Sequence, residues 1–132
     1  MADERIPSEQ EVFAFILEKI ESVPHLEALV LLWESRPKIW SATDLAARLY
    51  VDSDTARKLL QDLHRESLIS TVADPVGQYS CQSADDKLDG MMNAVSETYR
   101  RETIRISTML HSKGSSALRD FARAFRFKRD PK

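Results

Sequence analysis

Apolar residues in the first half of the chain recur three or four positions apart, the spacing that places them on one face of a helix. The pattern predicts four helices: one from Ser8 to near Pro24, a second stopped by Arg36-Pro37, a third opened by Ser41 to Asp44, and a fourth from Ser53 to Ser67. Their apolar positions are Val12, Phe13, Ile16, Leu17 and Ile20, then Leu26, Leu29, Val30, Leu32 and Trp33, then Leu45, Ala46 and Leu49, and finally Ala56, Leu59, Leu60 and Leu63. The second helix has the broadest apolar face, so we expect it to be the central buried element.

Capping residues mark the beginnings of these helices. Ser8 with Glu11 three positions later forms a capping box, and Ser41 is suited to open the third helix. Ser53 or Asp54 is expected to cap the fourth helix.

The apolar period changes at Leu68. Leu68 to Ala73 and Gln78 to Cys81 are predicted to be strands, joined by a turn over Asp74 to Gly77, and Ile39-Trp40 is a short extended piece. One hairpin is too little sheet to be stable alone, so it must pack on the helices. The chain has 3 Gly and 5 Pro, which also favours helix over sheet, and we predict a mainly α fold.

A long helix is predicted from Ser83 to His111. Its apolar positions follow a heptad-like spacing that passes through Glu102, at Leu88, Met92, Val95, Tyr99, Ile106 and Met109. A helix of this length spans ~40 Å, longer than the core of one small domain requires. We therefore expect a homodimer through the segment Leu88 to Met109, in which the apolar positions form a seam between two copies. The alternative is that this apolar seam packs on the first helix of its own chain.

The C-terminal 20 residues are basic, and the rest of the chain is acidic. Lys113 to Lys132 holds seven basic and two acidic residues, which leaves −7 for the remainder of a chain with a net charge of −2. A short amphipathic helix is expected from Ala117 to Phe127. Its apolar face could dock on the domain, or the tail could bind DNA phosphates, a partner groove or a membrane surface. The anion-binding candidates are Arg119, Arg123, Arg126, Lys128 and Arg129.

Length and composition fit one domain with an appendage. We expect a domain over residues 1–111, including its flanking helices, and a basic tail over 112–132. The sequence has no signal-peptide pattern and no apolar run long enough to cross a membrane. Cys81 is the single cysteine, which is typical of a reducing compartment, so the expected location is the cytoplasm.

Residues 23–82 follow the predicted order helix, short strand, helix, turn, helix and hairpin, and they include the segment SATDLAARLYVDSDTARKLLQDLHRESLI. This order and this segment resemble those of the winged helix-turn-helix family. Ser41 caps the positioning helix, Ala46 lies where the two helices cross, and Val51 points inward from the turn. Leu68-Ile69 begins the wing. The long helix after the wing is similar to bacterial transcriptional regulators that dimerise through flanking helices.

The resemblance implies that the helix from Ser53 to Arg65 is a recognition helix for the DNA major groove. Removing its apolar positions leaves an outer face that also includes the acidic Asp54 and Asp62. The predicted DNA-binding residues are Thr55, Arg57, Lys58, Gln61 and Arg65. Arg and Gln make bidentate contacts with guanine and adenine, while Thr and Lys can reach phosphate.

Two features favour an alternative function, that of a winged-helix adaptor that binds another protein without binding DNA directly. The predicted wing has no Lys or Arg, and the sequence pI is near 5.9. A regulator that senses a small molecule is a variant of the first hypothesis, with Trp33, Trp40 and Tyr99 as candidate pocket walls.

The sequence gives no positive sign of catalysis. His25, His64 and His111 are far apart, and none has metal-ligand spacing with Cys81 or a carboxylate cluster, so each is expected at the surface or at a helix end. The sequence also lacks a Gly-rich phosphate loop and a nucleophile elbow. We therefore expect a non-enzymatic protein with no catalytic residues, metal or cofactor.

Overall fold

Helices dominate the part of the chain that the computed structural model describes, which is residues 6–72, 77–81 and 86–113. Of these residues, 69% lie in six helices, and the rest includes a small three-stranded antiparallel sheet, which confirms the mainly α prediction. In chain order the elements are α1 (Glu9–Lys19), α2 (Val23–Glu34), β1 (Trp40–Ser41), α3 (Ala42–Leu49), α4 (Ser53–Arg65), β2 (Ser70–Val72), β3 (Gln78–Ser80), α5 (Asp86–Arg101) and α6 (Thr103–His111).

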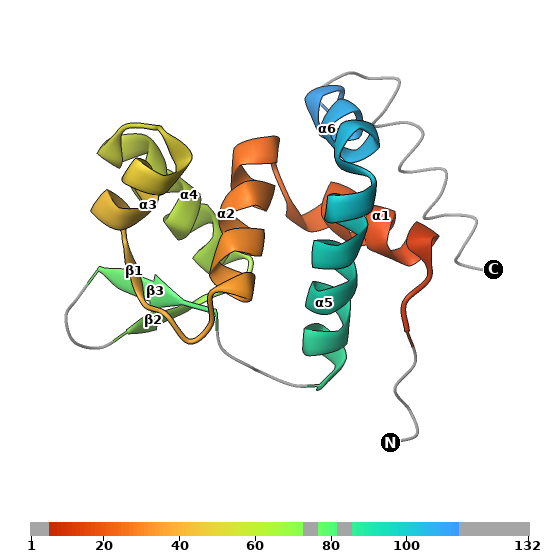
Figure 1. The fold of residues 1–132 in the computed structure, drawn as a ribbon, viewed down its shortest axis with the longest axis horizontal. Helices are drawn as coiled ribbons and strands as arrows, with labels where there is room; N and C mark the ends of the chain where they lie inside the picture. Colours follow the sequence, from red (N-terminus) through yellow and green to blue (C-terminus); the bar gives the residue numbers. More distant parts are fainter. Residues whose placement is uncertain (1–5, 73–76, 82–85, 114–132) are drawn as a thin grey trace.

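Helix α2 occupies the centre of the fold. It packs against α3 and α4 on one side and against α5 and α6 on the other, and the sheet lies at one end of the α3–α4 half (Figure 1). Helix α1 covers α5 and α6. Half of α2's twelve residues are buried, namely His25, Leu26, Ala28, Leu29, Leu32 and Trp33.

Local capping explains where the helices begin. The capping boxes Ser8–Glu11 and Ser41–Asp44 are both present. Helix α2 is capped by Ser22, and Pro24 lies in its first turn, where a missing N–H costs no hydrogen bond, so Pro24 does not end α1 as the sequence suggested.

The cap of α4 differs from the prediction. Asp52, rather than Ser53 or Asp54, accepts the backbone N–H of Thr55 at 2.8 Å. All three residue types are good caps, so only the backbone geometry of the turn selects among them.

The three strands are ordered β1-β3-β2, so the short segment before α3 is joined to the hairpin. Trp40 pairs with Tyr79 across β1 and β3, and Thr71 pairs with Tyr79 from the other side. The Trp40 indole N–H also donates to Ser35 Oγ at 3.0 Å, which ties β1 to the end of α2. Most of the predicted turn, residues 74–76, and the last predicted residue of the strand before it, residue 73, lie outside the described residues.

The predicted long helix is wrong as a single element. It breaks at Glu102, whose backbone (φ −119°, ψ 39°) is not helical, and α6 begins at the next residue. Tyr99 C=O accepts the Thr103 hydroxyl at 2.6 Å at this point. The break changes the helix direction (Figure 1), so Ile106 and Leu110 are buried against the same core as α5 instead of continuing past it.

Helix α4 ends in a Schellman motif. Leu68 N–H donates to Leu63 C=O at 3.0 Å and Ser67 N–H donates to His64 C=O at 2.9 Å, while Ser67 adopts the left-handed conformation with φ 62°. Leu63 and Leu68 are both buried, as the hydrophobic contact of this motif requires. The motif thus directs the chain from α4 into the hairpin.

A glycine should suit position 67 better than serine. We expect Ser67→Gly to raise the free energy of unfolding by about 0.5–1 kcal/mol, because relief of the left-handed strain exceeds the extra backbone entropy of the unfolded chain. Ser112→Gly, at a helix end with φ −88°, is the control and should give no increase. Urea unfolding of both variants measures the difference, and equal values would contradict the strain argument.

Candidate nucleic-acid interface

Helix α4 has one face in the core and one in solvent. Ala56, Leu59, Leu60 and Leu63 are buried and fix the helix against α2 and α3. The structure brings all five predicted DNA-binding residues to the exposed side of this one helix: Thr55, Arg57, Lys58, Gln61 and Arg65. The rigid inner face therefore holds a polar outer face in a fixed orientation.

Arg57 is paired with a neighbour on the same helix. Its guanidinium donates to Asp54 Oδ1 at 2.7 Å, and Asp54 is 89% exposed. An ion pair this open to water contributes little free energy, so an external anion can replace Asp54 at low cost.

The two polar neutral residues of the outer face differ in their surroundings. The hydroxyl of Thr55 bonds to the capping Asp52 and, with the backbone N–H of Thr55, lowers the pKa of that carboxyl. Gln61 is exposed, and its side chain has no hydrogen-bond partner among the described residues. Gln61 is therefore the more available of the two for an external contact.

Asp62 does not lie on the outer face, contrary to the prediction, and is only 5% exposed. Its carboxylate accepts from Lys58 at 3.2 Å and from Arg65 at 2.8 Å on the same helix, and from His25 of α2 at 2.8 Å. His25 lies in the first turn of α2, one of the two positions expected for it, but it is buried, with its Nδ1 2.6 Å from Ser22 Oγ. A charge can be buried here because it has three donors.

These contacts set the ionisation of Asp62. Burial by itself would raise the pKa of the carboxyl, but the hydrogen bonds from His25, Arg65 and Lys58 outweigh it and lower the pKa to about 2. Asp62 is thus a carboxylate at neutral pH. It forms ion pairs with two of the predicted DNA-binding residues, Lys58 and Arg65.

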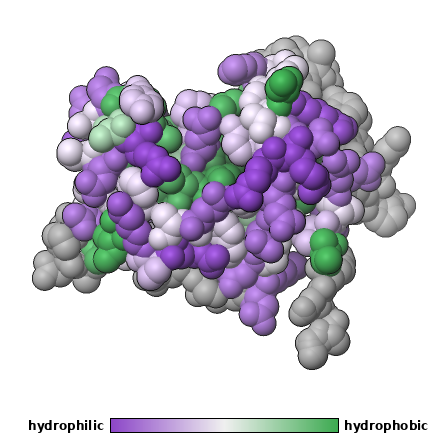
Figure 2. All heavy atoms as spheres, viewed as in Figure 1, coloured by the Kyte–Doolittle hydropathy of each residue, from purple (hydrophilic) through white to green (hydrophobic). Residues whose placement is uncertain are grey.

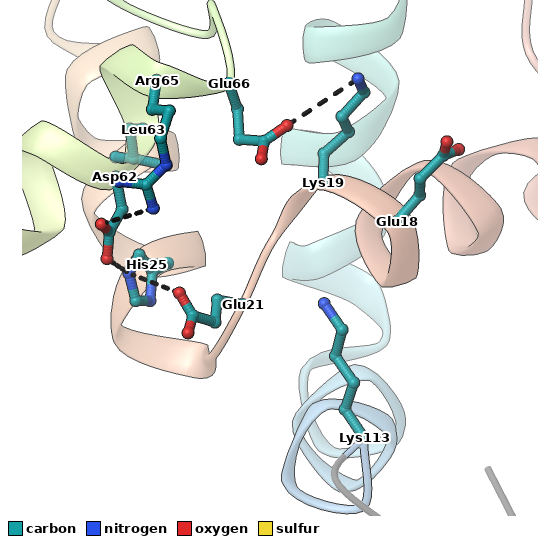
Figure 3. Close-up of a pocket in the computed structure, with 9 residues that line it drawn as sticks. All are labelled: Glu18, Lys19, Glu21, His25, Asp62, Leu63, Arg65, Glu66 and Lys113. Carbon is teal, nitrogen blue, oxygen red and sulfur yellow. Dashed lines mark hydrogen bonds and ion pairs between the residues drawn. The ribbon is translucent and has the colours of Figure 1, made fainter. Parts of the chain in front are cut away.

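A cleft of about 170 Å³ opens beside Asp62, where the end of α1, the start of α2 and the end of α4 meet (Figure 3). Acidic and basic side chains alternate around it, and the lining residues are Glu18, Lys19, Glu21, His25, Asp62, Leu63, Arg65, Glu66 and Lys113. The candidate pocket walls Trp33, Trp40 and Tyr99 do not line this cleft, and the two tryptophans are buried in the core.

The segment 42–65 is electrically balanced, with four Lys or Arg and four Asp. Hydrophilic residues cover most of the face seen in Figure 2, and apolar residues show near its middle. Of the predicted basic tail, only Ser112 and Lys113 are described, so Arg119, Arg123, Arg126, Lys128 and Arg129 lie outside the described residues.

Sequence reasoning missed Tyr50, which is 93% exposed in the turn between α3 and α4. Its φ of 61° is left-handed, a conformation that favours glycine. The signal in the sequence was an aromatic residue in the short turn next to the predicted recognition helix. Tyr50 adds an aromatic contact surface at the N-terminal end of α4.

Comparison of the chain with protein-family models, with curated proteins and with solved structures gave no match. Within residues 6–72, 77–81 and 86–113, no helix has the length and apolar character needed to cross a membrane.

The Asp62 contacts predict a specific pH dependence of stability. Because the folded-state pKa lies below the unfolded value, the ionised carboxylate contributes stability above about pH 4, which is lost as the pH falls toward 2. We expect Asp62→Asn to lower the free energy of unfolding at pH 7 by about 2 kcal/mol.

The measurement is urea unfolding at several pH values. The difference between wild type and Asp62→Asn should shrink steadily below pH 4, because protonation removes the charge in wild type as well. A difference that stays constant from pH 7 to pH 2 would contradict the role given to this carboxylate.

Proposed function

We propose that this protein is a DNA-binding transcriptional regulator of the winged-helix type, acting in the cytoplasm as a homodimer. The observation that carries the proposal is the outer face of α4, where Arg57, Lys58, Gln61 and Arg65 are exposed on a helix fixed in the core by its other side. A recognition helix requires this combination of a rigid inner face and long polar side chains outside.

The arrangement around α4 supports the winged-helix assignment. Helices α2, α3 and α4 pack together, and a hairpin follows α4 directly. The strand before α3 joins that hairpin in the order β1-β3-β2, so the short strand, the two helices and the hairpin belong to one unit. The left-handed Tyr50 makes the tight turn between α3 and α4.

The side chains of α4 divide between base and phosphate recognition. Arg57 and Gln61 are one helical turn apart and suit bidentate contacts with guanine and adenine. Lys58 and Arg65 suit phosphate contacts on the side of Asp62. Binding would exchange the ion pairs Arg57–Asp54 and Lys58–Asp62 for pairs with DNA.

Single substitutions should separate these two roles. We expect Gln61→Ala to weaken binding by about 1–3 kcal/mol at one preferred sequence only, because a base contact is lost. Lys58→Ala should weaken binding to all sequences and reduce the slope of log K against log salt by about 1. Mobility shifts of genomic fragments across a salt series measure both, and no binding by wild type even at ~50 mM salt would reject the proposal.

Removing the acid that competes for Arg57 should have the opposite effect. We expect Asp54→Asn to tighten DNA binding about two- to fivefold, because Arg57 no longer has to leave an ion pair and one repulsive charge is removed. The control is Glu97→Gln on the exposed side of α5, which changes the net charge equally but far along the chain from α4. An equal gain in both variants would mean that net charge, and not Arg57, governs binding.

The dimer is the second part of the proposal. The deepest residues of the predicted seam, Met92, Val95 and Ile106, are buried within their own chain, so a dimer contact would use the outer side of α6, where Ile104 is 81% exposed. We expect Ile104→Lys to convert a dimer into a monomer, while Asn93→Lys on the exposed side of α5 does not. Sedimentation velocity measures this, and a wild-type protein that sediments as a monomer would exclude the dimer.

The adaptor remains a second candidate function, favoured by the charge balance of segment 42–65. A segment with as many carboxylates as cations attracts DNA weakly, whereas the exposed Tyr50 is a residue type enriched at protein interfaces. An adaptor would retain a stoichiometric protein partner after nuclease treatment and would release it in the Tyr50→Ala variant. Failure of any partner to co-purify would remove this alternative.

A further inference from the structure

Three side chains with metal-binding chemistry meet at the mouth of the cleft in Figure 3. The ligand atoms of Glu21, His25 and Asp62 all lie within 4.8 Å of one another. His25 Nε2 is 2.8 Å from Asp62 Oδ2 and 3.7 Å from Glu21 Oε1. Ligands at about 2.1 Å from a tetrahedral ion are about 3.4 Å apart, so small side-chain movements bring these atoms to coordinating distance.

A hydrogen-bond partner on the other ring nitrogen of His25 allows its Nε2 to coordinate a metal. Ser22 Oγ lies 2.6 Å from Nδ1, on the far side of the ring. A hydroxyl can donate or accept, so Ser22 can donate to Nδ1 when Nε2–H is bonded to Asp62, and accept from Nδ1–H when Nε2 carries a metal. A second hydrogen bond of this kind fixes the ring orientation and tautomer in metal sites.

We propose that Glu21, His25 and Asp62 form a binding site for one divalent transition-metal ion such as Zn²⁺. One imidazole and two carboxylates are suitable ligands for such an ion, and three protein ligands leave a position for water. Glu21 is the mobile member, with a side chain that is 65% exposed, while His25 and Asp62 are buried and already in contact across α2 and α4. The site is independent of whether the protein binds DNA.

Metal binding has a definite consequence for Lys58. Its Nζ bonds to Asp62 Oδ2, the same oxygen that would coordinate the ion, so the ammonium and the metal compete. Lys58 is largely exposed and can turn into solvent. Arg65 bonds to the other oxygen, Oδ1, and can stay in place as an outer partner of the coordinating carboxylate. The metal therefore releases one cation on the outer face of α4.

The spacing of the three residues explains why the sequence gave no metal signal. Glu21 and His25 are four positions apart around the start of α2, but the third ligand is 37 residues further along the chain. Among the described residues, no other group of three or more His, Cys, Asp or Glu side chains is gathered closely enough to hold an ion.

The test is titration of the chelator-treated full chain with Zn²⁺ by calorimetry and with Co²⁺ by visible absorption. We expect one ion per chain and a Co²⁺ spectrum without a thiolate charge-transfer band, since Cys81 is not a ligand. Glu21→Gln should weaken binding at least tenfold, because it removes a ligand without disturbing the core. Glu18→Gln, at the same cleft but outside the three ligands, is the matched control and should bind as wild type does.

Lys58→Gln should tighten metal binding several-fold, because Asp62 loses the competing ammonium. Far-ultraviolet circular dichroism checks that each variant is folded. Absence of saturable binding, a thiolate band, or equal affinities of Glu21→Gln and Glu18→Gln would overturn the site. An unchanged affinity in Lys58→Gln would overturn the competition at Asp62.

Discussion

The burial of α2 is the constraint on which the rest of the structure depends. Its apolar residues occupy more than one face, so a single neighbouring layer cannot cover them. Helices α3 and α4 cover one side, and α5 and α6 cover the other. This requirement explains why the chain changes direction at Glu102, between α5 and α6. It also explains why one side of α4 is buried and only the other side is exposed to water.

The contact between His25 and Asp62 adds a polar connection to this apolar packing. It joins α2 to α4 at a point where burial of either group without a partner would be costly. Directional bonds specify one rotation of α4 more strictly than apolar contacts do, because a small roll of the helix would break them. The two cations on the same carboxylate share this orientation.

Local signals predicted much of the fold, whereas long-range contacts decided the rest. The capping boxes at Ser8 and Ser41 and the change of period at Leu68 depend on residues close in sequence, and each corresponds to an observed feature. The break at Glu102 could not be predicted, because it depends on where the core ends. For the site, helical periodicity identified the exposed residues of α4 but placed Asp62 on the wrong side, since nothing near it in sequence indicates His25 as its partner.

Under the proposed DNA-binding function, the pairing of every Lys and Arg of α4 with an aspartate would affect discrimination between DNA sites. Free arginines and lysines attract any phosphate backbone, and a genome offers a vast excess of unrelated sequences that compete for such a protein. Carboxylates that pair with the cations of the same helix lower its attraction for the phosphate backbone of all sequences alike. A loss that is equal for all sequences leaves their relative affinities unchanged, so base contacts would have to supply the whole preference for a target, and the aspartates would lower the overall affinity.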